Sequence, residues 1–236
     1  FLWFRLLWKS RRIPAYRERI AERFGVYSVP PKGKRPIWIH AVSVGECEAA
    51  FPLIRALLLR GDIPLLITCT TPTGSARIRE VLGDRVEHVY LPYDLPGAVE
   101  RFIDHFKPRL GLIMETEIWP NLFLGCGKHG MTLAILNARL SEKSARGYEK
   151  LSGLVGLSLQ QVTQIAAQTR ADAERFVRIG AARDRISVLG NIKFSIRFDN
   201  ELRMQSADLR RSLFADRKIW IAGSTHPGDA PSGTFT

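Results

Sequence analysis

The chain has 236 residues, of which 45% are hydrophobic, enough to bury one full core and part of a second. Its 35 basic and 23 acidic residues give a net charge of +12, which favours a polyanionic partner: nucleic acid, an anionic membrane or a phosphorylated substrate. The three cysteines stand alone, which argues against a disulfide scaffold, and none of the five histidines pairs at metal-ligand spacing, so we expect no bound metal.

The charge excess is concentrated in residues 1–35, which carry ten basic residues and two acidic ones. This segment opens with the apolar and aromatic run FLWFRLLW, which is too short to span a bilayer. Aromatic residues followed by Arg and Lys are typical of an interfacial anchor or of the cytoplasmic end of a spanning helix. We therefore expect a membrane-proximal segment whose anchor begins upstream. The alternative is an amphipathic helix that docks on its own domain.

Short apolar runs then alternate with helical patterns. Strands are predicted at residues 37–42, 64–70, 86–91, 110–114, 131–136, 164–168, 186–189 and 218–222. Helices are predicted at residues 46–60, 73–82, 96–106, 119–128, 142–159, 170–179 and 202–214. The repeated strand-then-helix order predicts an α/β fold over residues 36–190, a Rossmann-like, doubly wound parallel sheet with helices on both faces.

The pattern changes near the end of the chain. Residues 191–215 are typical of a crossover between domains, and the fresh strand at 218–222 runs into the sequence GSTH. We therefore assign residues 216–236 to the truncated start of a second α/β domain. Residues 230–236 show no core pattern, so we expect the chain to be cut off, or to run into non-native sequence, just before them.

The most informative single residue is Glu46. It follows the first strand and the loop residues Ser43 and Gly45, and a helical pattern begins after it. Open α/β sheets bind ligands beyond the carboxyl ends of their strands, where a carboxylate could take a proton from a substrate. The alternative is that Glu46 only places a favourable negative charge in the first turn of a helix. Spacing alone favours this plainer interpretation.

Other polar clusters follow further predicted strands, as residues lining a cleft at one sheet edge would. Hydroxyls and helical N–H groups after the second strand could hold an anion, although a plain N-cap is an equal alternative. Paired carboxylates beside a Trp follow the fourth strand, and groups able to bind phosphate or carboxylate follow the fifth. The candidate substrate-binding residues are Ser43, Gly45, Thr71, Thr73, Gly74, Glu117, Asn137, Arg139, Ser224 and Thr225.

Several sequence blocks resemble those of the 3-deoxy-D-manno-octulosonic acid (Kdo) transferases. They are PAYR at 14–17, ERFG at 22–25, HAVSVGE at 40–46, TPTG at 71–74, YLPYD at 90–94, METEIWPN at 114–121, NARLS at 137–141 and GSTH at 223–226. The resemblance runs in the correct order from about Arg5 to His226. It implies a GT-B fold, in which two Rossmann-like domains face a cleft, and this chain would be the N-terminal, acceptor-binding part.

The resemblance implies transfer of Kdo from CMP-Kdo to the lipid A precursor, lipid IV(A), with inversion, at the cytoplasmic face of the Gram-negative inner membrane. It makes Glu46 the general base that deprotonates the acceptor hydroxyl, and it assigns Glu115 and Lys193 to transition-state stabilisation. No metal or cofactor is implied. The acceptor phosphates and the anionic membrane surface would account for the basic segment, and nucleic acid becomes the weaker explanation because no nucleic-acid motif supports it.

The chain departs from the family pattern after His226, where the family continues with Gly-Glu and this chain continues with Pro227. Later blocks that grip CMP are absent, which puts the donor half in doubt. The alternative hypothesis is a truncated, inactive fragment that binds membrane and lipid A. A third possibility, another sugar-nucleotide enzyme of the same fold, is disfavoured by the SVGE and ETEIWP blocks.

Overall fold

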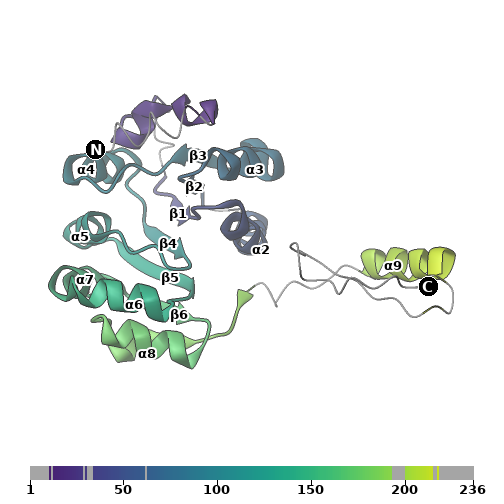
Figure 1. Ribbon diagram of the computed structural model, residues 1–236. Helices are drawn as coiled ribbons and strands as arrows, with labels where there is room; N and C mark the ends of the chain where they lie inside the picture. The colour runs from purple at the N-terminus through teal and green to yellow at the C-terminus, as the bar shows by residue number, and fades with distance from the viewer. Residues whose placement is uncertain are drawn as a thin grey trace. The chain divides into compact units, whose positions relative to one another are not determined.

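The computed structural model describes residues 11, 13–28, 30, 34–61, 63–192, 200–214 and 217. The chain divides into two compact units, residues 1–195 and residues 196–236. The second unit contains the helix α9 (Asn200–Phe214), which confirms the helix predicted there. The first unit is an α/β domain built on a seven-stranded sheet (Figure 1).

The sheet of the first unit is parallel throughout, with strand order β3-β2-β1-β4-β5-β6-β7. Its strands are β1 (Ile37–His40), β2 (Leu65–Cys69), β3 (Glu87–Tyr90), β4 (Leu110–Met114), β5 (Thr132–Ala138), β6 (Gln164–Ala167) and β7 (Ile186–Val188). Seven of the eight predicted strands are therefore confirmed. The eighth, at residues 218–222, lies outside the described residues, as does the expected start of a second domain.

Helices cover both faces of the sheet. The α-helices of the first unit whose bounds fall within the described residues are α2 (Val44–Arg60), α3 (Pro72–Leu82), α4 (Pro96–Phe106), α5 (Pro120–Lys128), α6 (Glu142–Glu149), α7 (Ser152–Leu159) and α8 (Arg170–Arg178). The corresponding 3-10 turns are η1 (Pro14–Arg17), η2 (Ile20–Phe24), η3 (Gly83–Arg85) and η4 (Arg183–Arg185). α2 and α3 lie on one face, and α4, α5 and α7 lie on the other (Figure 1). From β1 to β3 the chain adds strands in one direction, and from β4 to β7 it adds them in the other. Because each crossover is right-handed, the helices of these two series must lie on opposite faces of the sheet.

The prediction of a single helix over residues 142–159 is wrong, because the chain breaks between α6 and α7. The Leu151 N–H bonds to the Tyr148 carbonyl, three residues back instead of four, at 2.9 Å. Gly147 and Gly153 flank the break and lower the helix propensity there. α6 packs against α8 whereas α7 packs against α5, so one straight helix could not make both contacts.

The sheet separates two hydrophobic cores. Trp38 and Phe102 are fully buried on one side, and Ile39 and Ile54 are buried on the other. Every residue of β1 and β2 is buried, as expected for parallel strands covered on both faces. A Cβ at Gly111 would lie 2.9 Å from the Trp38 ring, so only glycine fits on β4 beside this indole.

The strand order fixes where ligands would bind. β2 and β3 lie on one side of β1, and β4 to β7 lie on the other, so the chain changes direction between β1 and β4. Open α/β sheets bind ligands at such a switch point, beyond the carboxyl ends of the strands. Within the described ranges, none of the helices combines the length and the apolar character needed to cross a membrane.

Candidate active site

The Glu46 carboxylate lies in the first turn of α2, where residues after β1 bond to both of its oxygens. Ser43 is the N-cap: its hydroxyl accepts from the Glu46 N–H (3.4 Å) and donates to Oε1 (3.1 Å). The Val42 N–H donates to Oε2 (2.8 Å). This reciprocal bonding is a variant of the capping box in which the carboxylate accepts from the residue before the N-cap, so Glu46 does serve as a helix-start residue. The residue is only 9% exposed, and this burial also changes the pKa of the carboxylate.

The pKa of the Glu46 carboxylate is about 7, well above the ordinary value of 4.5. Burial is the largest cause, because it disfavours the charged form. The Val42 N–H and the Ser43 hydroxyl oppose the rise, and the negative charges of Glu117 and Glu115 add to it. A carboxylate with a pKa near neutrality can take a proton during a reaction and release it afterwards, which is what a general base requires.

Both of those charges come from the loop between β4 and α5. Glu115 has a φ of 60°, in the left-handed region, and its N–H donates to the Leu136 carbonyl at 2.9 Å. Burial raises the pKa of Glu117, the neighbouring Trp119 opposes this rise, and the Glu115 charge adds to it. The three carboxylates therefore act on one another at the switch point, where a cation or a developing positive charge would be stabilised.

The last residues of β5 and the loop that follows them form the next part of this sheet edge. Asn137 is buried, has a φ of 53°, and accepts the Ile192 N–H on Oδ1 at 3.1 Å. Its Nδ2 has no partner among the described residues. Arg139 is exposed, and its carbonyl accepts the Thr116 hydroxyl, which ties this loop to the loop after β4. Asn137 therefore holds the chain that leaves β7 against the end of β5.

The loop after β2 uses its polar groups for internal bonds. The Thr71 hydroxyl accepts from the Gly74 N–H at 3.1 Å, as the N-cap of α3. The same hydroxyl donates to the Val42 carbonyl at 3.0 Å, which joins this loop to the one that holds Glu46. A Cβ at Gly74 would lie 2.9 Å from the Thr71 hydroxyl oxygen, so glycine permits this close approach. Thr73 is exposed.

The structure thus places the described site residues at or directly after the carboxyl ends of four strands of one sheet. These residues are Ser43, Gly45, Glu46, Thr71, Thr73, Gly74, Glu115, Glu117, Asn137 and Arg139. Lys193, Ser224 and Thr225, the remaining predicted site residues, lie outside the described residues. Substrate contact by any of these side chains stays a prediction.

Sequence reasoning missed a contribution from the N-terminal segment. Arg19, Glu22 and Arg23, which we had grouped with a membrane-proximal segment, pack at the ends of β2 and β3. Arg23 is only 3% exposed, although the charge pattern predicts solvated residues here. The ERFG block was the sequence signal that could have indicated this burial, because its two charged residues stand directly beside Phe24 and Gly25, as in a partly buried turn.

Asp94, from the YLPYD block, was also missed as a structural residue. Its carboxylate accepts the Asn121 N–H (3.1 Å) and the Leu122 N–H (2.8 Å) at the start of α5. The helix N-cap residue, Trp119, offers no side-chain cap of its own. Asp94 therefore caps a helix 27 residues later in the chain, and this helix directly follows the loop that carries Glu117.

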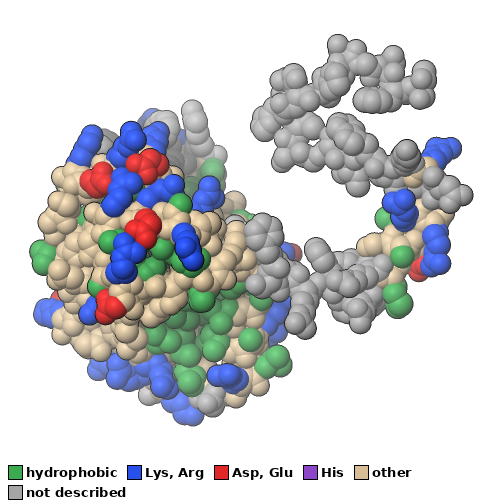
Figure 2. All heavy atoms as spheres, turned by 90° about the horizontal axis from the view of Figure 1, so that it is seen from below, with side chains coloured by type: hydrophobic (Ala, Val, Ile, Leu, Met, Phe, Trp, Pro, Cys, Tyr) green, Lys and Arg blue, Asp and Glu red, His purple; other side chains and the backbone are tan. Residues whose placement is uncertain are grey.

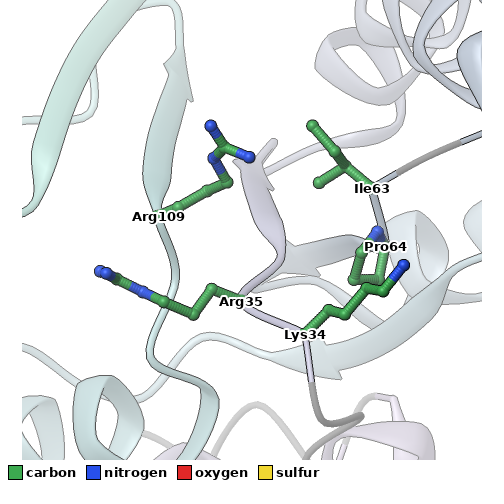
Figure 3. Close-up of a pocket in the computed structure, with 5 residues that line it drawn as sticks. All are labelled: Lys34, Arg35, Ile63, Pro64 and Arg109. Carbon is green, nitrogen blue, oxygen red and sulfur yellow. The ribbon is translucent and has the colours of Figure 1, made fainter.

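A cavity of about 520 Å³ lies at the opposite edge of the sheet. Its lining comprises Lys34, Arg35, Ile63, Pro64 and Arg109 (Figure 3). These residues come immediately before β1, β2 and β4, whereas the candidate site follows the strands. The cavity is basic, but none of the predicted site residues lines it.

One group of possible metal ligands occurs among the described residues, away from the strand ends. Glu100, Asp104 and His129 bring ligand atoms within 4.8 Å of one another on α4 and next to α5. Glu100 already pairs with Lys128 at 2.8 Å, and Asp104 is exposed. Exposed acidic clusters of this kind are common without a metal, so we assign no metal site to it.

Comparison with known proteins identifies relatives for most of the chain. A family model described as 3-deoxy-D-manno-octulosonic-acid transferase (kdotransferase) matches residues 18–196. The 3-deoxy-D-manno-octulosonic acid transferase of Haemophilus influenzae is 43% identical, over 93% of this chain and 52% of the relative. The transferase of the same name from Bordetella pertussis is 37% identical, over 83% of this chain and 47% of the relative. The chain therefore spans about half the length of these curated relatives.

Solved structures show the fold alone. The UDP-GlcNAc 2-epimerase of Neisseria meningitidis superposes with a TM-score of 0.50 over 76% of this chain and 54% of that chain. Only 14% of the residues are identical. The likeness supports the Rossmann-like arrangement of the sheet and carries no information on substrates.

Proposed function

Because this chain belongs to the 3-deoxy-D-manno-octulosonic acid (Kdo) transferase family, we propose that it forms the acceptor half of an enzyme that transfers Kdo from CMP-Kdo to the lipid A precursor, lipid IV(A). The observation that carries the proposal is the Glu46 carboxylate, buried at the switch point with a pKa of about 7. A transferase needs such a group to accept the proton of the acceptor hydroxyl.

The proposed reaction is a single inverting displacement. The acceptor oxygen bonds to the anomeric carbon of Kdo, its proton passes to Glu46, and the bond from that carbon to the CMP phosphate oxygen breaks with its electron pair leaving on CMP. Glu115 stabilises the positive charge that develops on the sugar, and Lys193 stabilises the negative charge on the departing phosphate. One base suffices, since an inverting displacement forms no covalent intermediate.

The basic character of the chain supports action at an anionic membrane surface, which we take to be the cytoplasmic face of the inner membrane. On the face of the first unit shown in Figure 2, Lys and Arg side chains lie along the lower margin of an apolar patch, while acidic and basic side chains are interspersed above it. Leu151, Leu154 and Leu157 are exposed at three-residue spacing on and beside α7. Each Lys or Arg near an anionic surface gains roughly 1 kcal/mol.

Substitution of Glu46 tests the proposed base. In a polypeptide that joins this chain to the second half found in its relatives, we expect Glu46→Ala to lower the transfer rate by roughly 10²–10⁴, because a general base is lost. Glu48→Ala is the matched control, since Glu48 is an exposed carboxylate on the same helix, paired with Arg77. An unchanged rate in the Glu46 variant would rule out the assigned role.

The second candidate function is a membrane- and lipid A-binding module without transferase activity of its own. The observations that favour it are the net charge of +12 and the exposed side chains of Leu151, Leu154 and Leu157, which suit an anionic membrane surface. Incubating the 236-residue chain with CMP-Kdo and a lipid acceptor separates the two candidates. Lipid binding without product supports the module, whereas product formation shows that this half is sufficient.

A further inference from the structure

We propose that Arg23 and Thr71 are positioning residues for the Glu46 carboxylate, acting through hydrogen bonds that run from the N-terminal segment to the loop after β1. The inference rests on the proposed role of Glu46 as the general base. It assigns a catalytic purpose to residues that touch neither the reacting carboxylate nor its neighbours Glu115 and Glu117.

Arg23 occupies an energetically unfavourable place. Its guanidinium is buried, its Nη1 donates to the Thr70 carbonyl at 3.0 Å, and its central carbon lies 4.1 Å from the Tyr90 ring centroid. Nε and Nη2 have no partner among the described residues. A buried charge with unpartnered N–H groups costs stability, so stability alone does not explain an arginine here.

Neighbouring residues keep the segment of Arg23 in place. Glu22 accepts the Tyr90 N–H at 2.7 Å and pairs with Arg19 at 3.3 Å. Arg19 donates to the His88 carbonyl at 3.3 Å and to the Ser75 hydroxyl, which lies in the first turns of α3. The segment therefore holds the end of β3 and the start of α3 together, on either side of the Thr70 carbonyl.

Thr71 transmits this constraint to the loop after β1. Its backbone follows Thr70, whose carbonyl Arg23 holds, and its hydroxyl donates to the Val42 carbonyl at 3.0 Å. The Gly74 N–H donates to the same hydroxyl and sets its direction. Because a hydroxyl has one proton, the bond from the Gly74 N–H leaves that proton for the Val42 carbonyl.

Val42 is the last link. Thr71 holds the carbonyl of Val42, and the N–H of the same residue donates to Glu46 Oε2 at 2.8 Å. This bond favours the ionised carboxylate, against burial and the charges of Glu117 and Glu115. Among the described residues, those two carboxylates are the charged groups with the largest effect on Glu46, and the loop after β2 contributes hydroxyl and backbone groups.

The main test compares Thr71→Val with Thr71→Ser in the full-length enzyme. Val keeps the shape but loses the bond to Val42, so we expect kcat near neutral pH to fall on the order of 10-fold with little change in the acceptor KM. The acid limb of the kcat–pH profile should move up by roughly half a unit or more, because the ionised carboxylate loses support. Ser keeps the hydroxyl and should restore both.

Two further variants separate positioning from stability. Thr169→Val removes an equivalent N-cap hydroxyl from α8, where Thr169 accepts the Asp172 N–H at 3.1 Å, and it should leave the acid limb unmoved. Arg23→Met removes the bond to Thr70 and the buried charge together, so we expect it to fold at least as stably while still raising the acid limb. This variant provides the test if Thr71→Val does not fold.

The outcomes distinguish the two levels of inference. A raised KM with an unmoved acid limb would overturn the proposal, because Thr71 would then contact substrate directly. An unmoved acid limb in both Thr71→Val and Arg23→Met would also overturn it, while an inactive Glu46→Gln variant in the same assay would leave the proposed base intact. An active Glu46→Gln variant would instead overturn the proposed function itself.

Discussion

At Glu46, one carboxylate meets two opposing demands. The capping bonds from Val42 and Ser43 stabilise its ionised form, while burial and two neighbouring carboxylates favour the protonated form. The balance leaves the pKa at about 7. A helix cap alone would be better served by an ordinary, exposed carboxylate with a low pKa, so the burial at this position is the feature that a cap does not need.

We predict that Glu46→Gln gains stability over the unchanged protein as the pH rises from about 5 to about 8. The folded protein keeps the Glu46 proton up to about pH 7, whereas the unfolded chain releases it near 4.5, so the folded state binds more protons between these values and stability falls. Because Gln cannot ionise, the difference in free energy of unfolding between the variant and the unchanged protein should grow by on the order of 1 kcal/mol after solvent screening. Urea unfolding of both proteins across this pH range measures the difference, and Glu48→Gln is the control. A difference in free energy of unfolding that does not change with pH would contradict the prediction.

At the scale of elements, long-range caps hold the helices that carry the site. α5 begins after Trp119, which provides no side-chain cap, and Asp94 supplies the missing acceptors from the loop after β3. Asn121 returns a bond from its side chain to the Asp94 carbonyl at 2.8 Å. The YLPYD and METEIWPN blocks therefore depend on each other, and Asp94 acts on the site through the position of the helix that follows Glu117.

We predict that Asp94→Ala lowers the free energy of unfolding by about 1–2 kcal/mol, because two N–H groups at the start of α5 lose their acceptor. Chemical denaturation of the purified chain measures this. Asp104→Ala on α4, which removes an exposed carboxylate, is the matched control and should change stability by less than about 0.5 kcal/mol. Equal effects of the two substitutions would show that the Asp94 cap contributes little.

At the scale of the whole molecule, the charge separates into a net-acidic candidate site and a strongly basic remainder. Three carboxylates gather at the switch point, although the chain carries a net charge of +12. This arrangement favours long-range attraction to an anionic surface while keeping negative charge where positive charge would develop.

We predict that the chain binds vesicles containing anionic phospholipid and that binding weakens strongly between low and high salt, because attraction between exposed charges is screened beyond about 10 Å at 0.1 M ionic strength. Vesicle sedimentation over a salt series measures this. Neutral phosphatidylcholine vesicles are the control. Binding that is equal for both lipids, or insensitive to salt, would contradict an electrostatic contribution.

The sequence alone was sufficient for the parts of the fold and site that depend on local pattern. Short apolar runs identified seven strands, a period of 3.6 residues identified most of the helices between them, and short polar blocks located the strand ends. Burial on both faces of a parallel sheet leaves apolar runs that are visible without a structure. Glu46 was singled out because it follows the first strand at the start of a helical pattern, and the resemblance of the surrounding blocks to a known family gave its expected role as the base.

The tertiary structure decided what depends on contacts between distant residues. The break between α6 and α7 follows from packing against different helices, and no local signal marks the Asp94 cap. The near-neutral pKa of Glu46 arises mainly from burial, and carboxylates about 70 positions away, which only the order of β1 beside β4 brings close, add to it. Desolvation and charge interaction depend on distance in space, and for such pairs sequence separation carries no measure of it.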